Sequence, residues 1–142
     1  LTTTDDPAIP GWVRLGYSTK AVLDGRVSFK LDATAGVMVG LMQSVPAGYT
    51  ATNVSIFGDR GSLKVFEGGI QQSLSVSPTY ATDDTLTIER KGKQITYWKN
   101  SEMVRRNDLS ADFTSTPQVV YVFSNTPGKP VITNAIVTGA IP

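Results

Sequence analysis

Hydrophobic and polar residues alternate most regularly between residues 83 and 100, DDTLTIERKGKQITYWKN. Two alternating segments flank a Lys-Gly-Lys turn at 91–93, an arrangement typical of an antiparallel β-hairpin. Because side chains alternate across a strand, one face of this hairpin should be apolar and buried. The residues predicted on that face are Leu86, Ile88, Ile95 and Tyr97. Trp98 is predicted on the opposite face, toward solvent or a partner.

The rest of the chain consists of similar short alternating segments, separated by Gly, Pro, Asn or Asp turns. Only 107–113 could hold a helical turn, since no longer window has the 3.6-residue period of a helix. The predicted strands are 11–17, 22–32, 37–42, 53–58, 62–67, 70–76, 85–90, 94–100, 102–106, 118–124 and 131–139. This number and spacing of strands predict an all-β, antiparallel sandwich or barrel.

Two local patterns refine the predicted sheet. Residues 37–42, VMVGLM, are apolar on both faces, which predicts a central strand packed on both sides. Gly40 within this strand indicates a close backbone approach or a bulge. The glycine-containing stretches 58–62 and 67–69 are predicted to form tight hairpin turns.

The length of 142 residues fits one domain with a substantial core. Residues 1–10, LTTTDDPAIP, are polar and contain two prolines. They are predicted to form a linker or extended arm that leads into a single β-sandwich domain at 11–142. Because the chain starts at Leu1 without a Met, we expect a fragment or a processed product. No run of about 18 apolar residues occurs, so no membrane insertion is expected.

Charge and composition narrow the function classes. A net charge of +1 is too small for bulk electrostatic binding to nucleic acid or to a membrane surface. Cysteine and histidine are absent, which excludes disulfides, thiolate or imidazole metal sites and His-based catalytic triads. Calcium could still bind oxygen ligands at the doublets 5–6 or 83–84, but neither has the spaced pattern of a calcium loop. No metal or cofactor is therefore predicted, and the 83–84 doublet is interpreted as capping a turn.

The order of segments between residues 20 and 138 carries a family pattern. A strand reading vmvGLs precedes a strand that ends in an acidic residue and Gly, and a segment gD.l.I.R.g..i.Y.kNg follows. The matching positions are Gly40-Leu41, Glu67-Gly68, Asp84, Leu86, Ile88, Arg90, Gly92, Ile95, Tyr97 and Asn100. The chain thus resembles the concanavalin A-like (legume-lectin-like) jelly rolls found in bacterial adhesins and at phage tail-fibre tips. The E-x-D-x-E strand of related glycoside hydrolases and the Asp/Asn loop that holds calcium and manganese in legume lectins are both missing. The resemblance therefore implies an antiparallel β-sandwich that binds a ligand and is not an enzyme.

Glycoside hydrolysis needs two carboxylates that flank the scissile bond. Four residues on different predicted strands and turns could supply them: Asp59, Glu67, Asp84 and Glu89. Asp59 and Asp84 lie in turn contexts, and Glu89 could pair with Lys91 or Lys99. Solvated or paired carboxylates are the preferred interpretation, and no catalytic residue is predicted.

Trp98 is the sharpest binding candidate, because an outward aromatic ring can stack on the C–H face of a sugar. Lys99 and Asn100 follow it and could bond the hydroxyl groups. Arg90 is also near on the predicted hairpin, although strand parity places it inward, where it could form a buried ion pair. The alternative for Trp98 is packing against another sheet, the 102–106 strand or a subunit.

Three further residues complete the predicted ligand-binding set. Tyr49 and Tyr80 lie in the two longest predicted loops, 43–52 and 77–84, where tyrosines serve either as contact residues or as loop anchors. Arg105 belongs to the sequence Arg-Arg-Asn at 105–107, which could form a small basic lip or a solvated turn.

These patterns predict an extracellular, non-enzymatic binding head at the tip of a phage or bacterial surface fibre. Its expected partner is a cell-surface glycan or receptor, and a homo-oligomer, with a trimer favoured, would compensate for the absence of disulfides. One alternative is a structural capsid, spike or fibre subunit whose jelly roll serves assembly. The other is a glycoside hydrolase or lyase relative with an unrecognised site.

Overall fold

A computed structural model describes residues 4–5, 13–17, 22–42, 54–68, 70–74, 79–108, 119–124 and 132–140. Its strands are β1 (Thr4–Asp5), β2 (Val13–Tyr17), β3 (Val22–Leu31), β4 (Gly36–Met42), β5 (Val54–Asp59), β6 (Ser62–Glu67), β7 (Ile70–Gln72), β8 (Leu86–Lys91), β9 (Gln94–Lys99), β10 (Glu102–Asp108), β11 (Val119–Ser124) and β12 (Ile132–Ala140). All eleven predicted strands are present. β1 is an additional strand within the predicted arm, where Thr4 pairs with Arg14.

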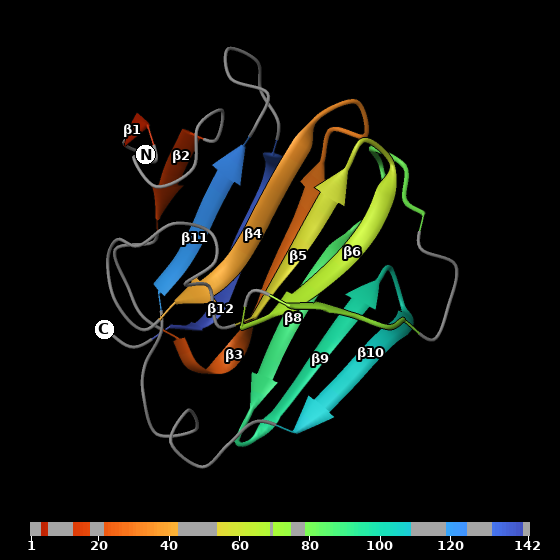
Figure 1. Ribbon diagram of the computed structural model, residues 1–142. Helices are drawn as coiled ribbons and strands as arrows, with labels where there is room; N and C mark the ends of the chain where they lie inside the picture. The colour runs from red at the N-terminus through yellow and green to blue at the C-terminus, as the bar shows by residue number, and fades with distance from the viewer. Residues whose placement is uncertain are drawn as a thin grey trace.

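The strands form two antiparallel sheets that pack face to face (Figure 1). The seven-stranded sheet has the order β1-β2-β11-β4-β5-β6-β7, and the five-stranded sheet has the order β10-β9-β8-β3-β12. The predicted antiparallel β-sandwich is therefore confirmed. The described residues contain no helix long and apolar enough to cross a bilayer. Of the expected helical turn at 107–113, the first two residues belong to β10, and the others lie outside the described residues.

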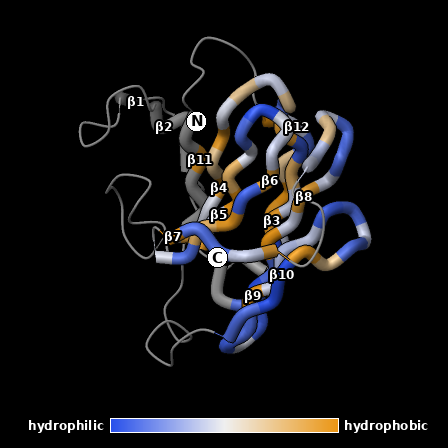
Figure 2. The backbone as a smooth tube through the Cα atoms, turned by 45° about the vertical axis from the view of Figure 1, so that its right-hand side comes forward, coloured by the Kyte–Doolittle hydropathy of each residue, from blue (hydrophilic) through white to orange (hydrophobic). Residues whose placement is uncertain are grey.

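The core lies between the two sheets and draws on both of them. Figure 2 shows apolar stretches of β3, β4 and β5 in the middle of the molecule, and hydrophilic stretches at the β9–β10 end. The buried cluster consists of Val27, Phe29, Leu31, Ala35, Val37, Val39, Leu41, Val54, Ile56, Leu63, Val65, Tyr80, Leu86, Ile88, Ile95, Tyr97, Val104 and Val122. It contains all four residues predicted on the inner face of the β8–β9 hairpin, so the predicted alternation of that hairpin is confirmed.

The VMVGLM strand is β4, which lies between β11 and β5 in the middle of the seven-stranded sheet. Val37, Val39 and Leu41 face the core, and Met38 on the opposite face is buried as well, as predicted for a strand packed on both sides. Pairing runs without interruption through Gly40, opposite Ser55 and Tyr121. No bulge occurs at this position.

The tight turn predicted at 58–62 is present. Of the turn predicted at 67–69, Gly68 has a φ of 61° and Gly69 lies outside the described residues. Arg60 and Gly61 connect β5 to β6 with positive φ angles of 51° and 93°, which match the two central residues of a hairpin turn with left-handed backbone. Gly92, between β8 and β9, has a φ of 57°. Its N–H donates a hydrogen bond to Asp24 Oδ1 at 2.8 Å, which ties this turn to β3.

Candidate binding face on the five-stranded sheet

Trp98 lies in a row of side chains that crosses the outer face of the five-stranded sheet. The row is set by strand register and reads Ile136, Ser28, Thr87, Trp98, Met103. Its two ends are exposed apolar groups, since Ile136 is 59% and Met103 38% accessible to solvent. In the middle of the row the Ser28 and Thr87 hydroxyls lie 2.9 Å apart and form a hydrogen bond. The row therefore combines an aromatic ring, two apolar side chains and a hydroxyl pair.

A charged row lies next to this one on the same face. It reads Thr138, Arg26, Glu89, Thr96, Arg106 in register order. Arg26 Nη2 and Glu89 Oε2 form an ion pair at 2.5 Å, so β3 and β8 are joined by charge at this point. Glu89 was expected to pair with Lys91 or Lys99. That prediction was wrong, because the register of β3 against β8 places Arg26 directly opposite Glu89.

A hollow of about 320 Å³ opens beside Trp98, and we name it the Trp98 hollow. Its lining consists of Arg26, Thr87, Trp98, Asn100 and Ser101. The indole N–H of Trp98 is buried and has no hydrogen-bond acceptor among the described residues. The exposed part of the indole is thus its carbon framework, with hydroxyl, amide and guanidinium groups around it. This combination of an apolar surface with a few polar groups is typical of small-molecule sites.

Asn100 lines the Trp98 hollow but also has a structural task. It occupies the left-handed region with a φ of 55°, and its side-chain oxygen accepts the Thr85 N–H at 3.0 Å. Its side-chain amide donates to Asp84 Oδ1 at 3.0 Å. The backbone N–H of Ala81 and the Asn100 amide together lower the pKa of Asp84, with the Ala81 bond as the larger cause. The interpretation of Asp83-Asp84 as a turn cap is confirmed for Asp84.

The other predicted ligand-binding residues are distributed around the molecule. Lys99 donates from Nζ to the Thr79 carbonyl at 3.1 Å. Arg90 faces inward as parity predicted and is only 1% exposed, so it lies outside the Trp98 hollow. Burial lowers the pKa of its guanidinium, and the charge of Asp24 opposes that shift. Tyr49 lies outside the described residues.

Tyr80 is a core residue, which overturns its prediction as a ligand contact. Its side chain is buried in the core cluster, and its hydroxyl lies close to Gly58. A Cβ built on Gly58 would approach Tyr80 Oη to 2.5 Å, so the glycine is required for this close approach. The loop-anchor alternative for Tyr80 is the correct one.

Arg105 lies within β10, in agreement with the predicted strand at 102–106, so the expected basic lip or solvated turn does not form at this residue. Its guanidinium donates to Glu67 Oε1 at 2.9 Å, to Gln72 Oε1 at 3.2 Å and to the Ser73 carbonyl at 3.3 Å. Since β6 and β10 belong to different sheets, the Arg105–Glu67 ion pair joins the two layers at one side of the sandwich. Arg105 is thus committed to an intramolecular contact.

Glu67 is the centre of this junction between the sheets. In addition to Arg105, it accepts the Tyr97 hydroxyl at 2.8 Å and the Asn107 amide at 3.0 Å. We name these four residues the inter-sheet clasp. Burial, followed by the charge of Glu67, raises the pKa of Tyr97 well above its usual value. Both oxygens of Glu67 have bonding partners, as expected for a structural carboxylate.

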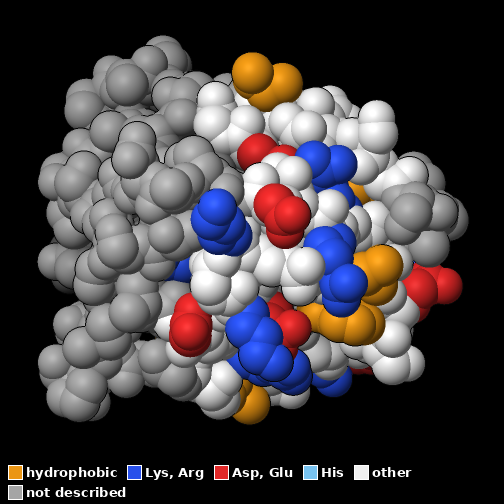
Figure 3. Space-filling model, turned by 90° about the horizontal axis from the view of Figure 1, so that it is seen from below, with side chains coloured by type: hydrophobic (Ala, Val, Ile, Leu, Met, Phe, Trp, Pro, Cys, Tyr) orange, Lys and Arg blue, Asp and Glu red, His pale blue; other side chains and the backbone are white. Residues whose placement is uncertain are grey.

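The remaining carboxylate candidates also have partners within the chain. Asp59 accepts Lys64 at 2.8 Å and Arg60 at 3.0 Å, and the bond from Lys64 is the largest cause of its lowered pKa. Within the described residues no group of three or more acidic side chains is placed to hold a metal ion. On the face seen in Figure 3, basic and acidic side chains are interspersed. This distribution agrees with a net charge of +1.

The outer face of the seven-stranded sheet carries aromatic residues that the sequence patterns did not single out. The Phe57 and Phe66 rings lie 6.1 Å apart at 51°, and Lys64 Nζ lies 5.6 Å from the Phe57 ring centroid. The available signal was the alternation within 53–58 and 62–67, which places both phenylalanines opposite the core-facing residues. Arg26 was also missed, because only the pairing of β3 with β8 brings it near Trp98.

Comparison with known proteins places this fold in a recognised class. No family model matches the chain, and no curated protein matches it. Many solved structures resemble it, and three of them illustrate the range. The SPRY domain of human HERC1 has a TM-score of 0.58 at 15% identity and covers 91% of this chain and 89% of its own. A toad ovary galectin in complex with thio-digalactose has a TM-score of 0.55 at 10% identity, with coverages of 84% and 92%.

The third is the alginate lyase AlgAT5 from polysaccharide lyase family 7, with a TM-score of 0.54 at 13% identity and coverages of 89% and 68%. These neighbours include both lectins and enzymes, and identities this low establish the fold alone. The chain therefore has the concanavalin A-like lectin/glucanase jelly-roll fold, which confirms the resemblance at the level of fold. The fibre or adhesin context stays a prediction.

Proposed function

We propose that this domain is a non-enzymatic carbohydrate-binding module that holds its ligand on the outer face of the five-stranded sheet. The observation that carries the proposal is the Trp98 hollow, where an indole framework is surrounded by the polar groups of Arg26, Thr87, Asn100 and Ser101. Sugars present C–H faces to aromatic rings and hydroxyls to hydrogen-bonding groups, so this lining suits them. The galectin with bound thio-digalactose supports the ligand class by analogy of fold.

The absence of catalysis is part of the same proposal. Asp59, Glu67, Asp84 and Glu89 each bond to another group of the chain, which supports structural roles for these carboxylates. The residues of the clasp also lie on a different side of β9 from Trp98, because strand parity separates Tyr97 from Trp98. Release of sugars from a panel of polysaccharides by the purified domain would contradict this part.

A glycan array followed by titration calorimetry tests the binding site. Trp98→Ala should reduce affinity for the best array ligand roughly 30-fold, the size of a loss of about 2 kcal/mol at a central aromatic contact. Thermal unfolding of the same variant must show a folded protein. A blank array would contradict the proposed function itself.

Phe57→Ala provides the matched control, because it removes an aromatic ring from the outer face of the opposite sheet. Affinity should be unchanged in this variant. If Phe57→Ala abolishes binding while Trp98→Ala does not, the ligand occupies the seven-stranded sheet and the Trp98 hollow is not the site.

Assembly is the second candidate function, favoured by the exposed Ile136 and Met103 in the same row as Trp98. Light scattering of the purified domain distinguishes it from glycan binding. A stable homotrimer that binds no glycan, and that dissociates when Ile136 is changed to Ser, would support assembly at this face. A monomer would contradict it, and with it the trimer that the sequence analysis favoured.

A further inference from the structure

A second hollow lies beside the Trp98 hollow on the same sheet, and Arg26 lines both of them. We name it the Lys91 hollow. It has a volume of about 250 Å³ and is lined by Asp24, Gly25, Arg26, Glu89, Arg90, Lys91 and Thr138. Gly25 lies directly opposite Arg90 in the register of β3 and β8. The two hollows are therefore neighbours, with the Arg26–Glu89 ion pair at their boundary.

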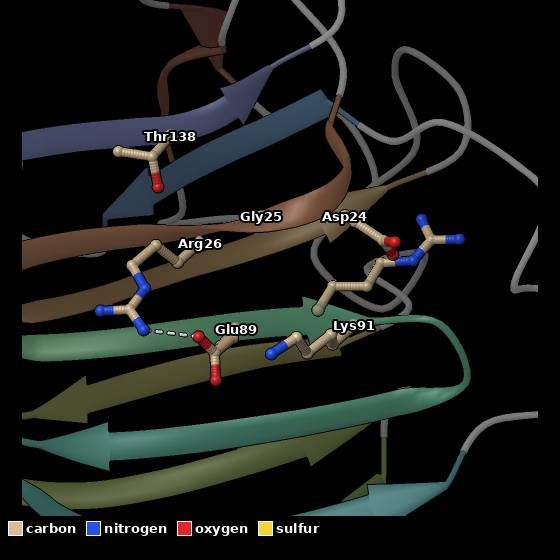
Figure 4. A pocket seen from close by; sticks show the side chains of 7 residues that line it. Asp24, Gly25, Arg26, Glu89, Lys91 and Thr138 are labelled. Carbon is tan, nitrogen blue, oxygen red and sulfur yellow. Dashed lines mark hydrogen bonds and ion pairs between the residues drawn. The ribbon is translucent and has the colours of Figure 1, made fainter.

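The Lys91 hollow carries a surplus of positive charge. Its lining has three cations (Arg26, Arg90, Lys91) and two carboxylates (Asp24, Glu89), which gives 3 − 2 = +1. In Figure 4 the Arg26–Glu89 pair is drawn at one side, with Lys91 beside Glu89 and with Asp24 farther along β3. Both carboxylates are already engaged, Glu89 by Arg26 and Asp24 by the Gly92 N–H.

Lys91 is the cation that the chain leaves available to a ligand. It is exposed, and it makes no ion pair within the described part of the chain. Arg90 also lines the hollow but is only 1% exposed, and the charge of Asp24 acts on its guanidinium, so Lys91 and not Arg90 is the group that a ligand can reach. An anionic group at this point would meet the accessible ammonium group of Lys91 in a hollow whose lining has a net charge of +1.

We infer that the Lys91 hollow is a subsite for an anionic sugar next to the Trp98 hollow. The ligand would then be an oligosaccharide of at least two units. One unit stacks on Trp98, and the adjacent unit presents a carboxylate or a sulfate to Lys91. This inference rests on the proposed function, because it extends the same site from a sugar to an acidic oligosaccharide.

The test measures the preference of the intact domain for acidic over neutral ligands. The probes are tetra-uronates and sulfated tetrasaccharides, each compared by calorimetry with its neutral counterpart, the carboxyl-reduced or desulfated tetrasaccharide. The acidic member of at least one pair should bind about tenfold more tightly, the size of one charge-assisted hydrogen bond. The preference should shrink as salt is raised from about 0.05 M to about 0.5 M, because Lys91 is exposed and screened.

Lys91→Gln should reduce the acidic-to-neutral affinity ratio toward one. Lys93→Gln is the matched control, since it removes one exposed lysine from the same hairpin but lies outside both hollows. The ratio should be unchanged in that variant. An equal effect of both substitutions would mean that general charge attraction, and not a subsite, sets the preference, and would overturn the inference.

Failure of the acidic subsite can be told apart from failure of the proposed function. If neutral and acidic tetrasaccharides bind equally well and Trp98→Ala still removes binding, the acidic subsite is wrong while the proposed function stands. If none of the acidic or neutral probes binds, the proposed function fails and the subsite fails with it. Uronates and sulfated sugars are distinguished by which pair shows the preference.

Discussion

Replacement of Glu67 by Ala should destabilise the domain more than replacement of Asp59, Asp84 or Glu89. The Tyr97 hydroxyl donates its hydrogen bond to Glu67, and the Tyr97 side chain is fully buried. A buried hydroxyl left without an acceptor costs about 1–3 kcal/mol. The same substitution breaks the ion pair with Arg105, in which the side chains of Glu67 and Arg105 are 10% and 20% exposed.

The expected loss in the free energy of unfolding depends on which bonds each partner of Glu67 keeps after the substitution. Breaking a fully buried ion pair costs about 3–5 kcal/mol, but Arg105 retains its bonds to Gln72 and to the Ser73 carbonyl. We therefore expect a total loss of about 3 kcal/mol in the free energy of unfolding, below the sum of the two costs. With a urea m-value of about 2 kcal/mol per molar, the unfolding midpoint should fall by about 1.5 M.

Urea unfolding followed by tryptophan fluorescence and by circular dichroism is the assay. Asp59→Ala is the control, because its ion pairs with Lys64 and Arg60 lie at the surface and should contribute about 0.5 kcal/mol. Tyr97→Phe should cost about 1 kcal/mol, and the double variant with Glu67→Ala should be less destabilised than the sum, since the orphaned hydroxyl is then absent. A midpoint for Glu67→Ala no lower than that for Asp59→Ala would refute the clasp. It would also restore Glu67 as a catalytic candidate.

Two further predictions concern the core and alkaline pH. Gly58→Ala should lower the free energy of unfolding in urea by about 1–3 kcal/mol, because the added Cβ would lie 2.5 Å from Tyr80 Oη and 2.8 Å from Leu31 Cδ1. A loss below about 0.5 kcal/mol would show that the Tyr80 ring can move aside. Since the folded pKa of Tyr97 is raised above the unfolded value of 10.0, the stability linked to its neutral form should be complete below pH 10 and be lost as pH rises from there toward the folded pKa. Stability curves measured between about pH 8 and about pH 11.5 should therefore fall less steeply for Tyr97→Phe, and parallel curves would contradict the assignment.

The inter-sheet clasp also shows how a structural carboxylate cluster can be told apart from a catalytic one. A carboxylate that accepts hydrogen bonds from a tyrosine, an arginine and an asparagine resembles a catalytic cluster by composition alone. Here Glu67 has a bonding partner at each oxygen and holds β6 to β9 and β10. The residue types in such a cluster therefore do not identify a catalytic site by themselves. The hydrogen-bond partners of the carboxylate must also be known.

Local sequence predicted the strands and the orientation of most of their side chains. Alternation with a period of two needs no knowledge of the partner strand, so it assigned Ile88 and Tyr97 to the core and Trp98 to the outer face. Turn chemistry is equally local, because Arg60-Gly61 and Gly92 need only a backbone that tolerates positive φ. The inward position of Arg90 follows from the same alternation, whatever surrounds it.

Only the tertiary structure decided which strands lie together, since strand pairing joins residues far apart in the chain. β3 pairs with β8 and β12, and this register brings Arg26 to Glu89 and to the Trp98 hollow. Tyr80 was ambiguous in sequence because a loop tyrosine can face either way, and the close approach of Gly58 made it a core residue. Residue types and their parity are thus encoded locally, whereas the composition of each hollow depends on contacts between distant segments.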